Sequence, residues 1–346
     1  MATRRDILRG LAVGLGVTAS TRGLAQPFDR AAYIGVETSA QTGVSRAVAF
    51  SGSGARTGQV PLDFRAHGMT QHGAQIVVFP RRPGDRFVVV GTDSLAIEAV
   101  VEAPHGRHFY GHGAFTGDGH HLLVPENDLN SLQGGLGLYA VGGEVRRVGQ
   151  IQLPDSGPHE IIRAPDRDLF YIALGGLMTH PDYGRTPLNL DTFRSQLLQF
   201  DFDRGSLEPM GHWAGTEGVS LRHLALDTGG KVYVGGQREF GAGQVLWRAD
   251  DRGAEAIDTG EMLKGYVSSI ATHGDTALVS SKDGNVVLTL SGGDIVQSTP
   301  MDGAGAVGLG PNLAAMSGYG LLNMNAATND VEAGFEFDNH GLVLKS

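Results

Sequence analysis

Histidines recur along this 346-residue chain at the start of short apolar runs, and they are the residues with the most chemistry to offer. Five of them open comparable stretches: His67, His112, His159, His223 and His340. Neutral imidazole is a good ligand for iron, copper, zinc or nickel. Several imidazoles gathered at one point repel when all are protonated, so such a cluster requires a metal or the neutral state. The alternative is that each is a core histidine that hydrogen-bonds the backbone of a neighbouring segment.

The segments around these histidines have the pattern of short β-strands. Residues 75–79 and 86–90 are rich in β-branched and aromatic residues, and the turn-forming residues 81–85 separate them. Similar strand–turn–strand units continue to the end of the chain, and its 53 glycines suit many tight turns. No segment after the first 25 residues carries the apolar stripe of a helix. We therefore expect an all-β protein.

The strands repeat at a longer period that the histidines mark. Ser269 and Ala306 continue the histidine series with small residues, and the openers lie roughly 34 to 64 residues apart. Propeller blades of four strands need about 40–50 residues, and the longest interval contains an insertion at residues 177–194. The pattern predicts a seven-bladed β-propeller, with six or eight blades as the alternatives.

The two ends of the chain are incomplete as blades. Residues 31–63 lack an opening strand, and His340 begins a strand with no partners after it. Pairing the C-terminal strand with the N-terminal strands completes one blade and removes open sheet edges. Because the first residues of inner strands point toward the central funnel, this closure would gather all five histidines near one end of the axis.

The first 25 residues are not expected to belong to the fold. Arg4 and Arg5 precede an apolar run at residues 8–17, which resembles a twin-arginine export signal. Small residues at 23 and 25 predict cleavage before Gln26. We therefore expect residues 26–346 to form a single propeller domain that is exported to the periplasm. The run is too short to span a bilayer, which needs about 20 residues, and no later stretch is apolar enough to do so.

Composition excludes several classes of function. The chain has no cysteine, so disulfides, cysteine-ligated zinc, iron–sulfur clusters and thioether-attached haem are ruled out. Its formal net charge of −10 makes it a poor partner for nucleic acid, whose phosphates require a basic face.

Further charged residues are candidates for contacting a ligand near the histidines. His108 and Glu126 form one set with Asp128, where a carboxylate would complete a metal shell or orient a histidine, or else simply cap a turn. His180 and Arg185 lie in the insertion, which is either a binding loop over the ring or a turn. The complete set of these ligand-contact candidates is Arg65, Arg107, His108, Glu126, Glu160, His180, Arg185 and Arg222. His120 and His121 lie in a turn and are expected at the surface.

Five stretches of the chain resemble a known family: residues 106–128, 157–160, 179–191, 221–225 and 338–340. Together they are similar to domain-of-unknown-function family 1513, over most of the chain after the signal. The resemblance implies an exported, propeller-like bacterial protein, often encoded beside imelysin-type proteins of periplasmic iron uptake. It supplies a context and an expected partner, but no reaction.

Three functions fit these observations. The first is a periplasmic protein that binds iron or copper through His67, His112, His159, His223 and His340 and works with an iron-uptake system. The second is a hydrolase or oxidoreductase that uses the same metal, with Glu126 or Glu160 as a nearby acid or base. The third is an interaction scaffold without metal, whose rim binds a partner such as an imelysin.

Overall fold

The computed structural model describes residues 31–210, 213, 216–309, 313–317, 320–323, 326–328 and 335–345. Within these residues the secondary structure is β-strand, with one short 3-10 turn, η1 (Pro181–Tyr183), and no α-helix. The prediction of an all-β chain is therefore confirmed. No helix in the described part is long and apolar enough to cross a membrane. The expected signal, residues 1–25, lies outside the described residues.

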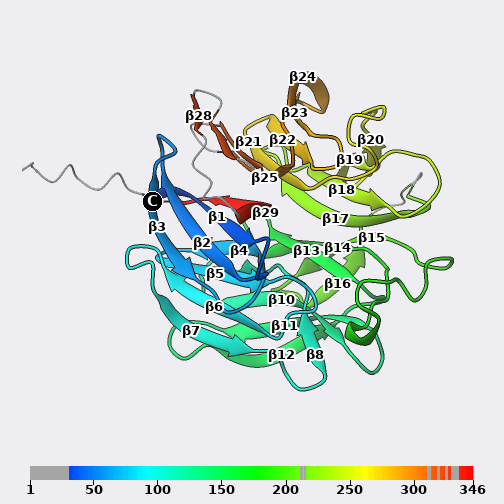
Figure 1. Ribbon diagram of the computed structural model, residues 1–346. Helices are drawn as coiled ribbons and strands as arrows, with labels where there is room; N and C mark the ends of the chain where they lie inside the picture. Colours follow the sequence, from blue (N-terminus) through cyan, green and yellow to red (C-terminus); the bar gives the residue numbers. More distant parts are fainter. Residues whose placement is uncertain are drawn as a thin grey trace, which may run out of the picture.

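The strands form antiparallel sheets that stand around a common centre, as the blades of a β-propeller do (Figure 1). One sheet orders β29 (Phe335–Val343), β1 (Ala31–Ser39), β2 (Ser45–Ser51) and β3 (Arg56–Pro61). The next holds β4 (Ala66–His72), β5 (Gln75–Pro80), β6 (Arg86–Gly91) and β7 (Ile97–Glu102). A third holds β8 (Arg107–Phe109), β9 (Ala114–Phe115), β10 (His121–Asp128), β11 (Gly134–Ala140) and β12 (Arg146–Gln152).

Four further sheets continue the ring in chain order. The first holds β13 (Pro158–Arg163), β14 (Leu169–Leu174), β15 (Gln196–Asp201) and β16 (Ser206–Pro209). The second holds β17 (Val219–Leu226), β18 (Val232–Arg238), β19 (Leu246–Asp250) and β20 (Gly253–Ala256). The third holds β21 (Ser269–His273), β22 (Thr276–Ser281), β23 (Val286–Ser291) and β24 (Asp294–Pro300). The last holds β25 (Ala304–Leu309), β26 (Leu313–Ser317), β27 (Gly320–Asn323) and β28 (Ala326–Thr328).

Of these sheets, six lie wholly within the described residues, whereas the sheet β25–β28 is interrupted by residues outside them. The structure thus establishes a β-propeller. The predicted count of seven blades depends on this interrupted sheet, and we return to it with the proposed function.

The C-terminal strand closes the ring, as the sequence predicts. β29 pairs antiparallel with β1, with Leu342 opposite Ile34 and Phe337 opposite Glu37. Figure 1 shows β29, in red, running into the centre beside the blue N-terminal strands. The last strand in sequence is therefore an innermost strand of the first blade.

The core lies between neighbouring blades, and strand periodicity explains why. In β5, Ile76 and Val78 pack against the sheet that contains β1, whereas Val77 and Phe79 pack against the sheet that contains β10. Successive side chains of a strand point to opposite faces, so a strand buried on both faces is apolar throughout. Outer strands such as β12 instead alternate exposed and half-buried residues. This packing holds the first strand of each blade against the axis.

Candidate metal centre

The inner strands depart from regular pairing where the predicted histidines lie. In β13, Pro158 and Glu160 pair with consecutive residues of β14, so His159 is an extra, unpaired residue. In β17 the extra residue is Arg222, directly before His223. Similar register shifts occur in β4 around His67 and in β29 around His340. Such β-bulges re-aim side chains, and here they direct imidazoles toward the axis.

His112 reaches the same place by another route. It lies in the irregular segment between β8 and β9, not in a strand as the sequence pattern predicts. Gly111 precedes it with a φ of +106°, a conformation that favours glycine. A side chain at Gly111 would come within 2.7 Å of the His67 ring. The segment thus lets the chain pass close beside a second histidine.

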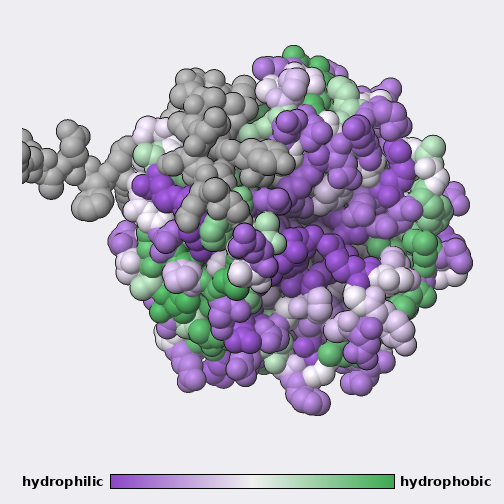
Figure 2. Space-filling model, in the orientation of Figure 1, coloured by the Kyte–Doolittle hydropathy of each residue, from purple (hydrophilic) through white to green (hydrophobic). Residues whose placement is uncertain are grey.

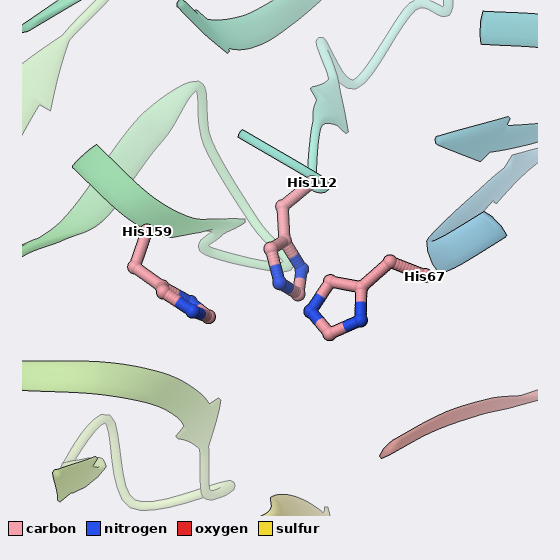
Figure 3. A group of neighbouring side chains, drawn as sticks. All are labelled: His67, His112 and His159. Atoms are coloured by element: carbon pink, nitrogen blue, oxygen red, sulfur yellow. The ribbon is translucent and has the colours of Figure 1, made fainter. Parts of the chain in front are cut away.

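The five imidazoles form one buried cluster on the axis. Ring centroids of His67 and His340 lie 4.5 Å apart, those of His112 and His340 lie 4.6 Å apart, and those of His159 and His223 lie 5.0 Å apart. None of the five residues is more than 8% exposed. Figure 3 shows the rings of His67, His112 and His159 pointing toward one another from three different segments.

Two sets of three histidines have the geometry to hold an ion. The ligand nitrogens of His67, His112 and His159 lie within 4.8 Å of one another, and so do those of His112, His223 and His340. Metal–nitrogen bonds of about 2.0–2.1 Å require the rings to draw closer than this on binding. Because His112 belongs to both sets, the arrangement suits one ion.

Two carboxylates lie behind the imidazoles. Nδ1 of His67 is 2.8 Å from Oδ1 of Asp338, and Nδ1 of His223 is 3.2 Å from Oε2 of Glu160. Oε1 of Glu160 lies 3.7 Å from Nδ1 of His112. A carboxylate at Nδ1 favours the tautomer with its proton there and leaves the Nε2 lone pair free, as in metal-bound histidines.

Several imidazole nitrogens have no hydrogen-bond partner among the residues that the structure describes. They are Nε2 of His112, Nδ1 of His159, Nε2 of His223 and Nε2 of His340. A buried polar atom without a partner costs about 1–3 kcal/mol, and such atoms are rare in folded proteins. Four in one cluster are therefore a specific feature of this site.

Burial keeps these imidazoles in the form that binds metals. It lowers the pKa of His112 to about 3 and holds the pKa values of the other four below their ordinary value. Burial alone would raise the pKa of Asp338, but the hydrogen bond from His67 and the charge of Arg81 hold it below its usual range. Burial raises the pKa of Glu160.

The cluster separates two hollows. One, which encloses about 20 Å³, is lined by His67, His159, His223 and a group of arginines. The other is lined by His112 and Glu160. Figure 2 shows hydrophilic residues gathered around a hollow at the centre of the ring.

Of the other predicted residues, Arg222 and Arg185 border the first hollow. Arg222 is buried and donates to Oε1 of Glu239 at 3.0 Å, whereas Arg185 is exposed in the insertion between β14 and β15. Arg65 is half-exposed and lies 3.8 Å from Asp338. The structure therefore places these three arginines around the cluster, none of them among the imidazoles.

His108 and His180 lie beside a smaller recess near the insertion. His108 is buried and stacks on Tyr110 with ring centroids 5.3 Å apart. His180 caps the turn η1, since its Nδ1 accepts from the backbone N–H of Asp182. His120 is exposed, as predicted, whereas the same prediction is wrong for His121, which begins β10, is only partly exposed and lies against the Phe202 ring.

Glu126 and Arg107 lie in a separate network inside their own blade. Both carboxylate oxygens of Glu126 have partners, Tyr139 at 2.7 Å and Arg147 at 2.9 and 3.1 Å. Arg107 lies 3.6 Å from Glu126 and 3.4 Å from Asp128. The structure does not bring this set to the histidine cluster, because its charges are already paired where they are.

Sequence reasoning missed Asp338, Arg81 and Arg82. Asp338 had a usable signal, since it precedes His340 by two residues and residues at this spacing share a strand face. Arg81 and Arg82 read only as part of a turn, and the side of the ring on which a turn lies is set by the closed fold.

The fold and this site together define a β-propeller with a buried histidine cluster on its axis. The chain belongs to the family described as "Protein of unknown function (DUF1513)", whose model matches residues 60–344. No curated protein matches the sequence significantly.

Solved structures share the fold. A functionally unknown protein from Desulfotomaculum acetoxidans DSM 771 aligns with a TM-score of 0.60 at 14% identity, over 89% of this chain and 99% of that one. The structure of U3-55K aligns with a TM-score of 0.59 at 12% identity, over 89% and 94%. RRP9 WD40 repeats align with a TM-score of 0.55 at 12% identity, over the same shares. At these identities the likeness concerns the fold alone.

Proposed function

We propose that this protein binds one transition-metal ion, iron or copper, through its axial histidines. The observation that carries the proposal is the group of four buried imidazole nitrogens that have no hydrogen-bond partner in the described part of the chain. His112, His223 and His340 are the central ligands, because each has a free Nε2 and their ligand atoms lie close together. His67 and His159 complete the set around the ion. Imidazole ligands suit both metals.

Charge balance supports a cation at this point. Asp338 and Glu160 lie behind neutral imidazoles, and Glu160 forms no ion pair with lysine or arginine among the described residues. A buried carboxylate without a compensating charge is costly. A divalent ion bound to the histidines would supply the compensating positive charge. One imidazole would then separate the ion from each carboxylate, as in carboxylate–histidine–metal arrangements.

Calorimetric titration of the metal-free protein with Cu²⁺, Fe²⁺ and Zn²⁺ tests the proposal. We expect one ion per chain, and His112→Ala should weaken binding by more than the 10- to 100-fold that loss of an outer partner costs. His120→Ala removes an exposed histidine and should leave affinity unchanged. If wild type and His112→Ala bind all three ions equally weakly, the cluster is structural and the scaffold function replaces this one.

We place this function in the periplasm, with an imelysin-type or other iron-uptake protein as partner. The support is the twin-arginine pattern in residues 1–25 and the family resemblance. Cells that lack the twin-arginine translocase should retain the uncleaved protein in the cytoplasm. Cleavage and export that persist in such cells would contradict this placement.

We also propose that the sheet β25–β28 is a seventh blade. β25 contacts β21 on one side and β29 on the other, which is the position that completes the ring. An experimental structure that resolves residues 310–334 tests this count.

A further inference from the structure

Four arginines border the hollow next to the histidine cluster: Arg81, Arg82, Arg185 and Arg222. They come from the turn between β5 and β6, from the insertion after β14, and from β17. Segments far apart in the sequence thus place guanidinium groups around one small space. The chain as a whole carries a net charge of −10, so this is a local reversal of sign.

The charges of these arginines are only partly matched by protein groups. Arg81 lies 3.6 Å from Asp338, a carboxylate that already binds His67. Arg82 donates to the neutral hydroxyl of Thr179 at 3.1 Å. Arg185 forms no ion pair with an acidic side chain of the described residues, and its charged neighbours include the other three arginines.

Arg222 provides the strongest sign of a missing partner. It is 4% exposed, and one of its terminal nitrogens donates to Glu239. Its Nε has no hydrogen-bond partner within the described ranges, although the residue lines the hollow.

We propose that this hollow binds a small oxyanion, a carboxylate or a phosphate, whose oxygens contact Arg82, Arg185 and Arg222 and ligate the ion on the histidines. The bridge to the ion rests on the proposed function, whereas the arginine contacts do not. Guanidinium groups present paired N–H donors that match carboxylate and phosphate oxygens. The hollow encloses only about 20 Å³, close to the space of one water molecule, so the ligand is a small anion that enters as the arginine side chains at the mouth move outward.

The position of the cluster explains why anion and ion would meet. His67, His159 and His223 line the same hollow as the arginines. An ion held by its three central imidazoles, or by all five in an octahedral arrangement, keeps an open coordination position, and an oxygen ligand from this hollow fills it. The bound metal would therefore increase the affinity of the hollow for anions whose oxygen can ligate it.

Calorimetric titration of the metal-free protein with inorganic phosphate and, separately, with succinate tests the arginine contacts. We expect at least one of the two anions to bind, and Arg82→Gln and Arg185→Gln each to weaken it about tenfold or more. Arg185 is exposed, so its replacement should not disturb folding. Arg204→Gln removes an arginine whose side chain is 81% exposed and is the matched control.

The relative affinity of the two anions identifies the ligand as carboxylate or phosphate. If neither binds, or if Arg185→Gln and Arg204→Gln behave alike, the anion site is wrong even where metal binding persists. Repeating the titration on protein loaded with Zn²⁺ tests the bridge, with tighter binding expected. Equal affinity with and without Zn²⁺ would overturn the bridge alone, and failure of metal binding would still leave the metal-free titration interpretable.

Discussion

Glu126 and Glu160 show how neighbours decide what a side chain does. The sequence pattern makes both Glu126 and Glu160 candidates for the metal shell. In the fold, Glu126 is held by Tyr139 and Arg147, whereas Glu160 faces the imidazoles of His112 and His223. Sequence alone cannot separate them, because the distinguishing partners come from other strands.

Substituting each glutamate should therefore give opposite results. Glu160→Gln removes the charge behind two ligands, so we expect metal affinity to fall about 10- to 100-fold with little change in stability. Glu126→Gln leaves Arg147, which is 26% exposed, with Gln150 as its side-chain partner and should destabilise the protein by about 1–3 kcal/mol while metal affinity is kept. Urea denaturation and calorimetry on both variants measure the two effects. Equal metal affinity in the two variants would exclude Glu160 as a positioning residue.

The buried histidines also predict how stability depends on pH. Each titrates near 6.5 in the unfolded chain, while the pKa of His112 is lowered to about 3 in the fold. Between these values the unfolded chain binds protons that the folded protein does not, so the free energy of unfolding falls as pH falls. Each such histidine contributes a slope of up to about 1.4 kcal/mol per pH unit.

Urea denaturation of the metal-free protein at pH 7.5, 6 and 5 measures this slope. The window lies above the ordinary carboxyl range, so Asp338, whose pKa is lowered, does not contribute, whereas Glu160, whose pKa burial raises, offsets part of the slope. His112→Gln removes one titrating group, so the slope of the free energy of unfolding against pH should fall by up to about 1.4 kcal/mol per pH unit. A stability that is unchanged between pH 7.5 and 5 would contradict neutral, buried imidazoles.

At the scale of elements, the strands were predictable and the bulges were not. Alternating apolar residues and turn residues locate the strands and the insertion after β14, because these patterns are local. A bulge is visible only against the partner strand, so the extra residues at His159 and Arg222 needed the paired structure. For the same reason His112 was placed in a strand, although it lies between β8 and β9.

Glycine at position 111 permits this irregular segment, and its replacement tests the geometry. Gly111 and Gly142 both have positive φ, +106° and +121°. A side chain at Gly142 meets open space, whereas one at Gly111 meets the His67 ring at 2.7 Å. Gly142→Ala should cost on the order of 1–3 kcal/mol from backbone strain alone. Gly111→Ala should cost more and also weaken metal binding, because it displaces His67. Denaturation and metal titration of both variants test this. Equal losses of stability and equal metal affinity in the two variants would show that the contact with the His67 ring is unimportant.

At the scale of the whole molecule, closure and site depend on one strand. β29 pairs with β1, buries Phe337 against Phe50, and carries Asp338 and His340 into the cluster. The sequence pattern predicts this closure because the N-terminal strands lack an inner member. It does not predict the arginine-lined hollow, since that surface exists only once the blades stand side by side.

Deleting residues 335–346 should therefore remove stability and metal binding together. Without β29 the edge of β1 and the apolar surface around Phe50 are exposed, so we expect the melting temperature to fall by more than about 10 °C, or the cooperative transition to disappear. His340→Ala keeps the strand and removes only a ligand, so it should melt within a few degrees of the metal-free wild type while binding metal weakly. Deleting only residues 345–346 controls for shortening the chain. Calorimetric melting of the three variants separates ring closure from ligation, and a Δ335–346 protein that melts like His340→Ala would show that the ring does not depend on this strand.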